Sequence, residues 1–369
     1  MTTIEIAFLV VTCLYFLQGI LLLVGLARTR YAADAMHEPM VSIVVAARNE
    51  EHNIGTCIAS LAEIEYPKDK LEVIIVDDQS TDATSRIVTE AACRHPFLRL
   101  VHATPSTGGI HGKANALAQG IDHATGEIVM MTDADCTAHP QWVRKTVRYF
   151  SPSVGIIAGF TLLDVRGWFS GLQSLDLAYI LGLGAAAIGL RLPLSCIGNN
   201  FSFRRKAYDE VGGYRGVPFS VTEDFALFKA IIRSGRWDYR FPMETETLIT
   251  SKPCERWIDL YRQKRRWAVG GKEIQFHGVF LFIIGFAVHA GIALQLTVPS
   301  LMSWSIFAAG IAIKIAADYL FLSGVLARTN HRSHLRYFFL FELYFLLYVG
   351  LLPLIVFLGG KVVWKERKF

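Results

Sequence analysis

The chain has 369 residues, of which 52% are hydrophobic, and its mean hydropathy is +0.36. These values exclude an ordinary soluble protein, while a charged fraction of 19% excludes a bundle that lies wholly within a membrane. The net charge of +5 is modest, and the Lys and Arg residues gather near apolar segments, which favours anionic lipid headgroups over nucleic acid as a partner. The polar and apolar characters must therefore occupy different regions.

The apolar segments lie at both ends of the chain. Residues 6–27 are long enough to cross a bilayer, end at Arg28 and Arg30, and precede no small-residue cleavage site. They predict an uncleaved anchor over residues 1–30, with its basic end in the cytoplasm. Residues 276–327 are long enough for two crossings and residues 337–360 for a third. We therefore expect one N-terminal and about three C-terminal membrane or interfacial helices, the latter over residues 276–360.

The tail at residues 361–369 conflicts with this topology. Three full crossings after a cytoplasmic domain would place the tail outside, whereas its cations, Lys361, Lys365, Arg367 and Lys368, favour the inside. The conflict disappears if one segment is re-entrant or lies along the interface. We expect interfacial helices near residues 168–190 and 255–272, where apolar or basic stretches are broken by glycines or charges.

Residues 40–275 show alternating strands and helices. The predicted strands are 41–47, 71–76, 98–102 and 127–132, and the predicted helices are 54–61, 83–93 and 113–123. This alternation predicts an α/β domain with a Rossmann-like, mostly parallel sheet, whose ligand site lies at the carboxyl ends of the strands. The polar clusters that follow Ala47, Val76 and Thr132 all fall at such ends.

Two common nucleotide sites are excluded by the residues at these ends. A dinucleotide oxidoreductase needs glycines directly after its first strand, where this chain has Arg48-Asn-Glu-Glu51. The P-loop pattern GxxxxGK[ST] is absent from the sequence. A nucleotide site built from carboxylates remains.

The acidic strand ends are suited to a cation and a base. Asp133 and Asp135 place two hard oxygen donors near one divalent ion, and Mg²⁺ prefers such carboxylates together with substrate phosphates. An isolated pair of this kind usually belongs to a solvated turn, but here it follows an apolar strand beside a second acidic strand end. Asp78 is either a turn or capping residue or an acceptor for a base N–H group.

Five segments occur in a fixed order: Val73–Asp82, Gly112–Leu117, Asp133-Ala-Asp135, Thr222-Glu-Asp224 and Gln263-Lys-Arg-Arg-Trp267. Together they resemble the successive motifs of membrane-integrated inverting glycosyltransferases of family 2, which include cellulose, chitin and hyaluronan synthases and ceramide glucosyltransferases. The resemblance covers about residues 40–270. It implies a GT-A fold that uses a UDP-sugar with Mg²⁺ or Mn²⁺.

The resemblance also implies a role for each motif residue. Uridine would be held by Glu50 and Asp78, with Asp77 beside them, and Lys113 would lie near the nucleotide or its phosphates. Asp133 would contact the ribose or phosphate side and, with Asp135, the metal.

On the acceptor side, Asp224 would be the general base, with Glu223 as the runner-up. Gln263, Arg266 and Trp267 would close the site, with Arg266 on the diphosphate and Trp267 beneath the acceptor. Asn199 and Asn200 resemble a segment that precedes the acceptor pocket, although they depart from the cysteine-containing pattern of cellulose synthases.

Two groups of charged residues have competing interpretations. Most cations and aromatic residues of 256–267 are expected to contact lipid headgroups. Gln263, Arg266 and Trp267 stand at i, i+3 and i+4, so one helical face can present them while Lys264 and Arg265 point elsewhere. In the C-terminal segments Lys314 and Asp318 are four residues apart and can pair, and Glu342 lies in the last segment; such charges serve either function or structure.

The acceptor is the least determined part of the reaction. Transfer of one sugar to a membrane lipid explains why a catalytic domain is tied to a membrane, and about four segments are few for exporting a polymer. A processive polysaccharide synthase, acting with partner subunits or as a homo-oligomer, is the main alternative. A non-catalytic scaffold with a nucleotide site is a third. In each case we expect a multi-pass protein of the bacterial inner membrane with its polar domain in the cytoplasm.

Overall fold

The computed structural model describes residues 1–33, 38–106, 109–194, 196–218, 220, 222–270, 276–357, 363–364 and 367–368. They form two compact units. The sheet unit comprises Thr29–Asp164 and Ser195–Lys252, and the helical unit comprises Met1–Arg28, Val165–Leu194 and Pro253–Phe369. The chain therefore passes four times between the units.

The sheet unit is built on seven strands in the order β3-β2-β1-β4-β8-β6-β9. Their bounds are β1 (Val41–Ala47), β2 (Leu71–Asp77), β3 (Leu98–His102), β4 (Ile128–Asp133), β6 (Val154–Ala158), β8 (Phe201–Arg204) and β9 (Asp238–Arg240). β1 pairs in parallel with β2 and β4, and β2 with β3, so four carboxyl ends meet at one edge. β8 runs antiparallel between β4 and β6. The predicted mostly parallel sheet is confirmed.

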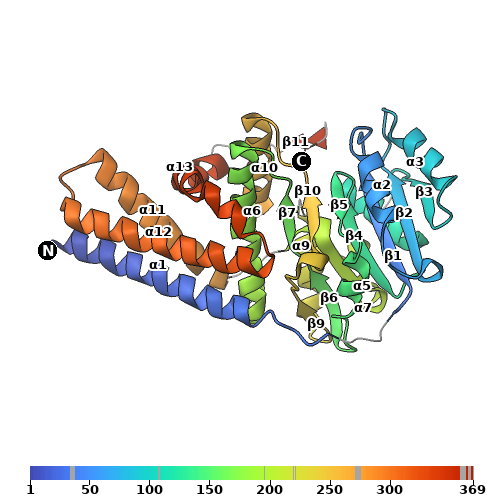
Figure 1. Cartoon of the computed structure of the whole chain (residues 1–369), viewed down its shortest axis with the longest axis horizontal. Helices are drawn as coiled ribbons and strands as arrows, with labels where there is room; N and C mark the ends of the chain where they lie inside the picture. Colours follow the sequence, from blue (N-terminus) through green and yellow to red (C-terminus); the bar gives the residue numbers. More distant parts are fainter. Residues whose placement is uncertain are drawn as a thin grey trace. The chain divides into compact units, whose positions relative to one another are not determined.

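Helices pack on the buried strands of this sheet, as Figure 1 shows for α2 and α3 beside β1, β2 and β3. The helices are α2 (Ile54–Ala62), α3 (Thr84–Ala92), α4 (Lys113–His123), α5 (Trp142–Val147), α7 (Arg205–Glu210), α8 (Gly213–Gly216) and α9 (Glu223–Arg233). α4 approaches the sheet closely at Gly120, where a Cβ atom would lie 2.6 Å from Val76 Cγ2 and 2.7 Å from Val44 Cγ1. This contact holds the first residue of α4 near the carboxyl ends of the strands. A second sheet has the order β5 (Cys136–Ala138), β10 (Ile249–Ser251), β7 (Thr161–Leu163).

Six helices make up most of the helical unit: α1 (Thr3–Ala27), α6 (Trp168–Gly189), α10 (Trp257–Gly270), α11 (Phe276–Thr297), α12 (Trp304–Arg328) and α13 (Phe338–Phe357). Among the described residues, five helices are long and apolar enough to cross a membrane. Four of these, α1, α11, α12 and α13, match the predicted segments. The fifth is α6, which we expected near the interface; 89% of its most apolar window is buried among other parts of the protein.

Polar residues join the helices of this unit at one buried point. Lys314 Nζ lies 3.0 Å from Asp318 Oδ2, as the four-residue spacing predicts, and also pairs with Glu342 of α13. Asp318 Oδ1 accepts hydrogen bonds from the hydroxyl groups of Tyr15 on α1, at 2.6 Å, and Tyr179 on α6, at 3.1 Å. Figure 1 shows α1, α11 and α12 side by side, in agreement with their contacts. The cluster thus connects four helices.

Only two pairs of residues of the predicted tail are described. They form the short strands β11 (Val363–Trp364) and β12 (Arg367–Lys368), which pair in antiparallel fashion. Lys361 and Lys365 lie outside the described residues.

Candidate functional site

The loops that follow β1 and β2 are tied to each other. Asn49 and Gln79 have φ values of 52° and 60°, a left-handed conformation that is unfavourable for residues other than glycine. The backbone N–H of Asn49 donates to Ser80 Oγ at 3.0 Å, and Asn49 Oδ1 accepts from the backbone N–H of Thr81 at 2.9 Å. The strained turns are therefore held by hydrogen bonds, which is typical of ligand-binding loops.

Asp77 and Asp78 are both buried at the end of β2, with exposed fractions of 4% and 5%. The carboxylate of Asp77 accepts from the backbone N–H of Ser80 at 3.1 Å, and its other oxygen lies 3.5 Å from His102 Nδ1. Arg48 Nη1 donates to the carbonyl oxygen of Asp78 at 2.8 Å. Asp77 thus stabilises the turn in which Asp78 lies. The sequence did not indicate that these two neighbouring residues have different roles.

Glu50 anchors the other side of this region. Its Oε2 accepts from Asn53 Nδ2 at 2.7 Å, and Asn53 Oδ1 accepts from Lys252 Nζ at 2.5 Å. The backbone N–H of Glu50 donates to Thr84 Oγ1, at the first residue of α3, at 2.8 Å. Glu50 is therefore fixed at the carboxyl edge of the sheet, as predicted.

Asp133 is the last residue of β4, and Asp135 lies between β4 and β5. Burial and the nearby negative charges of Asp133 and Glu50 raise the pKa of Asp135 to about 6, although Cys136 Sγ donates to its Oδ1 at 3.4 Å. Asp135 is thus close enough to two other carboxylates to be affected by their charges. Asp133 and Asp135 supply the carboxylate oxygens that a hard divalent cation prefers, and such a cation would favour the ionised form of Asp135.

Lys113 connects three elements of the site. It is the first residue of α4 and follows Gly112, whose φ of 60° suits glycine at this turn. Its Nζ donates to Asp133 Oδ1 at 2.5 Å and lies 3.7 Å from Glu223 Oε1 at the start of α9. These charges raise the pKa of Lys113 despite its burial, so it stays a cation. The sequence motifs around Lys113, Asp133 and Glu223 therefore meet in space.

Asp224 follows Glu223 in the first turn of α9 and is half-buried. Its Oδ1 accepts from the backbone N–H of Phe225 at 2.8 Å. Burial and the charge of Glu223 raise the pKa of Asp224 to about 7, although Lys113 acts in the opposite direction. A carboxyl group with this pKa is suited to accept a proton near neutral pH.

Asn199 and Asn200 are buried, and their amide groups are engaged inside the sheet unit. Asn200 Oδ1 accepts from Trp142 Nε1 at 3.1 Å, and its Nδ2 donates to the carbonyl oxygens of Phe160 and Thr247 at 2.8 and 3.0 Å. Asn199 Oδ1 accepts from Thr161 Oγ1 at 2.8 Å. Both residues hold the segment before β8 in place, and their predicted acceptor role stays a prediction.

The Gln263–Trp267 segment belongs to α10 of the helical unit. Gln263, Arg266 and Trp267 are half-buried, whereas Lys264 is only 2% exposed and pairs with Asp176 of α6. Lys264 is therefore an exception to the expectation that most cations of this segment contact headgroups, because its ammonium group pairs with a buried carboxylate inside the bundle. Lys264 Nζ lies 4.8 Å from the centroid of the Trp267 ring, so Trp267 lies on the Lys264 side of the helix.

Sequence reasoning missed Gly198, which borders Asp224. A Cβ atom at Gly198 would lie 3.0 Å from Asp224 Oδ2 and 3.2 Å from Asp224 Cβ. The two residues are far apart in the sequence, so no local pattern could have paired them. Arg48 was also missed as a residue of this site. Its position directly after β1 could have indicated that it stabilises the loop there.

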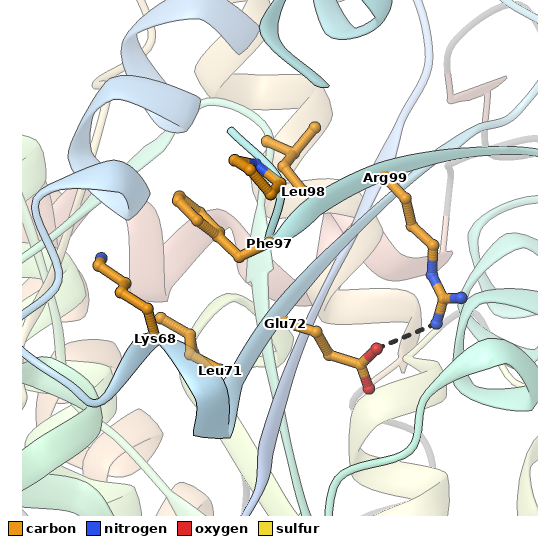
Figure 2. A pocket seen from close by; sticks show the side chains of 7 residues that line it. Lys68, Leu71, Glu72, Phe97, Leu98 and Arg99 are labelled. Atoms are coloured by element: carbon orange, nitrogen blue, oxygen red, sulfur yellow. Dashed lines mark hydrogen bonds and ion pairs between the residues drawn. The ribbon is translucent and has the colours of Figure 1, made fainter. Parts of the chain in front are cut away.

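A cavity of about 500 Å³ lies at the opposite end of β2 and β3 from Asp77. Figure 2 shows it lined by Lys68, Leu71, Glu72, Phe97, Leu98 and Arg99, with an ion pair between Glu72 and Arg99. This pair has an N–O distance of 3.0 Å, and Lys68 Nζ donates to the carbonyl oxygens of Ala62 and Ile64. The two cations that line the cavity, Lys68 and Arg99, thus already have partners within the protein. The cavity is also separate from the acidic strand ends.

The sequence is similar to those of two kinds of known synthase. A beta-monoglucosyldiacylglycerol synthase of Synechocystis sp. is 32% identical over 251 residues, which are 65% of this chain and 49% of that protein. A poly-beta-1,6-N-acetyl-D-glucosamine synthase of Staphylococcus epidermidis is 29% identical over 238 residues, 63% of this chain and 55% of that protein. The chain thus spans about half the length of the curated relatives it matches.

Two further matches concern the fold and the family of residues 42–222. A mannosyltransferase from Pyrobaculum calidifontis, solved in complex with GDP-Man and Mn2+, superposes with a TM-score of 0.63 and 22% identity, covering 92% of this chain and 99% of the other. This likeness confirms the predicted GT-A fold. Residues 42–222 match the model of glycosyl transferase family 2. The chain therefore carries a domain of glycosyl transferase family 2.

Proposed function

We propose that this chain is an inverting hexosyltransferase that moves a sugar from a UDP-sugar to a membrane lipid, with Mg²⁺ or Mn²⁺ at the donor diphosphate. The proposal rests mainly on one set of contacts. Lys113 pairs with Asp133, next to Asp135, and also approaches Glu223, which is followed by Asp224 with its pKa near 7. This set combines groups for a cation and diphosphate with a base in one site.

In this proposal each residue has a separate task. Glu50 and Asp78 bind the uridine at the ends of β1 and β2, while Asp77 holds the turn. Asp133 and Asp135 would hold the cation, and a bound divalent ion would supply positive charge to stabilise the diphosphate leaving group. Lys113 orients Asp133 and adds positive charge near the phosphates. Asp224 takes the proton of the acceptor hydroxyl as it attacks C1, a contribution of about 10²- to 10⁴-fold for a positioned base.

The helical unit supplies the remaining parts of the proposal. Arg266 and Gln263 of α10 bind the diphosphate, and Trp267 contributes to the acceptor side. The four long apolar helices that match the predicted segments, α1, α11, α12 and α13, support a multi-pass protein, and the basic residues that follow α1 support a cytoplasmic sheet unit. The names of the glucosyldiacylglycerol synthase relatives support a glycerolipid acceptor.

Radiolabelled transfer tests the proposal. Purified protein in lipid nanodiscs receives UDP-glucose, UDP-galactose, UDP-N-acetylglucosamine or GDP-mannose, with Mn²⁺ and diacylglycerol or total membrane lipid. We expect chloroform-soluble label with a UDP-sugar. Label confined to large aqueous products would favour a polymer synthase, the alternative that the N-acetylglucosamine synthase relatives support. A protein that binds the nucleotide but neither transfers the sugar nor hydrolyses the donor, whichever donor is supplied, would be a scaffold.

A further inference from the structure

Lys264, the second residue of the Gln263–Trp267 segment, lies at a junction of three helices in the helical unit. It and Asp176 of α6 are each 2% exposed, and they form an ion pair. Lys264 Nζ also lies 5.0 Å from the ring centroid of Tyr348 on α13. Because charged side chains are almost never fully buried without a partner, this pair connects α10 to α6 inside an aromatic environment.

Two more contacts join the same faces of α6 and α10. Gln173 Nε2 donates to the carbonyl oxygen of Cys254 at 3.0 Å, and Gln173 Oε1 accepts from its backbone N–H at 2.9 Å, just before α10 begins. The ring of Trp257, in the first turn of α10, lies 4.5 Å from that of Phe169. Phe169, Gln173 and Asp176 stand at i, i+4 and i+7 on one face of α6.

Of these contacts, the ion pair is the most demanding in geometry. Apolar packing is non-directional and tolerates rotation or sliding of one helix on another. A buried ion pair is different, because separating it leaves an uncompensated charge in an apolar medium. Asp176 Oδ1 has no hydrogen-bond partner within the described residues, so Lys264 is the group that the structure gives to neutralise this carboxylate. Only one register of α10 against α6 preserves the pair.

We propose that Lys264 and Asp176 are positioning residues, whose buried pair fixes the register of α10 and thereby sets Gln263 and Arg266 for the donor diphosphate. This inference rests on the proposed function of Arg266. Gln263 precedes Lys264 and Arg266 follows it by two positions, so a rotation of α10 displaces both. A misplacement of about 1 Å can lower a rate about 10²-fold.

The test replaces the pair by apolar residues of similar size, Lys264→Met with Asp176→Leu, in full-length protein in nanodiscs. Removing both charges leaves no unpaired charge buried, which favours folding of the variant. We expect UMP affinity to stay within threefold of wild type, UDP affinity to fall at least tenfold, and kcat to fall at least tenfold. If the apolar pair does not fold, Lys264→Gln with Asp176→Asn takes its place with the same expectations.

The matched control removes an exposed ion pair from the same helix. Asp259 Oδ2 lies 2.7 Å from Arg256 Nε at the surface, and Asp259→Asn should leave the UDP-to-UMP preference and kcat unchanged. If the double variant keeps both its UDP-to-UMP preference and its kcat within threefold of wild type, the positioning role is overturned. If wild-type protein prefers UDP to UMP but transfers no sugar from any donor, the proposed function fails, while loss of that preference in the double variant still supports the positioning role.

Discussion

Gly198 lies against the carboxyl group of Asp224, so closely that a Cβ atom would come within 3.0 Å of Oδ2 and 3.2 Å of Cβ. Such contacts are tighter than ordinary van der Waals packing, and Asp224 has little room to retreat because α9 fixes its backbone. We therefore expect Gly198→Ala to lower kcat about tenfold or more through displacement of the carboxylate. Binding of UDP should persist. Gly167→Ala is the control, since no atom lies within 4 Å of a Cβ atom there.

Asp224→Asn should abolish sugar transfer and leave UDP binding within a few-fold of wild type. Loss of UDP binding would instead assign Asp224 to the donor. The amide resembles the protonated carboxyl group that burial favours, so the variant should also be more stable above pH 7, on the order of 2 kcal/mol by thermal or denaturant unfolding.

Activity and stability should respond to pH in opposite directions at Asp224. Its pKa of about 7 in the folded protein exceeds its ordinary value of 3.8. Folding therefore favours the protonated form, and this stabilisation is present below about pH 4 and is lost as pH rises through 7. A base must be ionised, so kcat should rise through the same range. A kcat that stays flat from pH 6 to 8.5, with chemistry as the slow step, would argue against Asp224 as the base.

Lys113→Met should weaken UDP binding about tenfold or more, because Asp133 and Glu223 would lose the cation between them and repel a diphosphate. Calorimetric titration with UDP and UMP measures the effect, which should be larger for UDP. Lys145→Met, which removes a 3.9 Å contact with Glu246, is the control and should bind both as wild type does. Equal losses for UDP and UMP would place Lys113 away from the phosphates.

Removal of divalent cations with EDTA should stop transfer, and Mn²⁺ or Mg²⁺ should restore it. In Asp135→Asn the cation concentration needed for half-maximal activity should rise at least tenfold, since the amide keeps one oxygen but no charge. A thermal-shift assay provides a second readout: Mn²⁺ with UDP should raise the Tm of wild-type protein more than that of the variant. Unchanged metal dependence in the variant would exclude Asp135 as a ligand.

Lys314→Met should destabilise the helical unit by about 3–5 kcal/mol, because Asp318 and Glu342 would lose their shared cation inside the bundle. Unfolding in detergent, followed by circular dichroism, measures this change. The exposed Phe339, at 73%, offers a control in the same unit: Phe339→Ala should have little effect. An unchanged unfolding midpoint in Lys314→Met would mean that the two carboxylates are neutralised in another way.

Local patterns predicted much of the sheet unit. The expected strands 41–47 and 98–102 and the helix 113–123 have the observed bounds, because β-branched runs and helical periodicity are properties of neighbouring residues. The grouping of Asp78, Asp133 and Asp135 at one edge followed from the parallel sheet.

Features set by distant partners could not be predicted in this way. β8 is four residues long, and only its pairing between β4 and β6 places it in the sheet. The burial of Lys264 depends on Asp176, which lies 88 positions earlier (264 minus 176) on another helix. Both cases reflect long-range contacts that leave no periodic signal in the local sequence.

The division of the helical unit among three stretches of chain has a consequence for biosynthesis. α1 packs on α12, which begins roughly 280 residues after α1 ends. At about 5–20 residues per second, the ribosome needs on the order of 15–60 s to make that partner. α1 is long and apolar enough to span a membrane, so a lipid bilayer would shelter its apolar surface from water during this interval, while the sheet unit is being synthesised. In the proposed membrane protein, the first helix would thus wait in the bilayer until α12 is made and can pack against it.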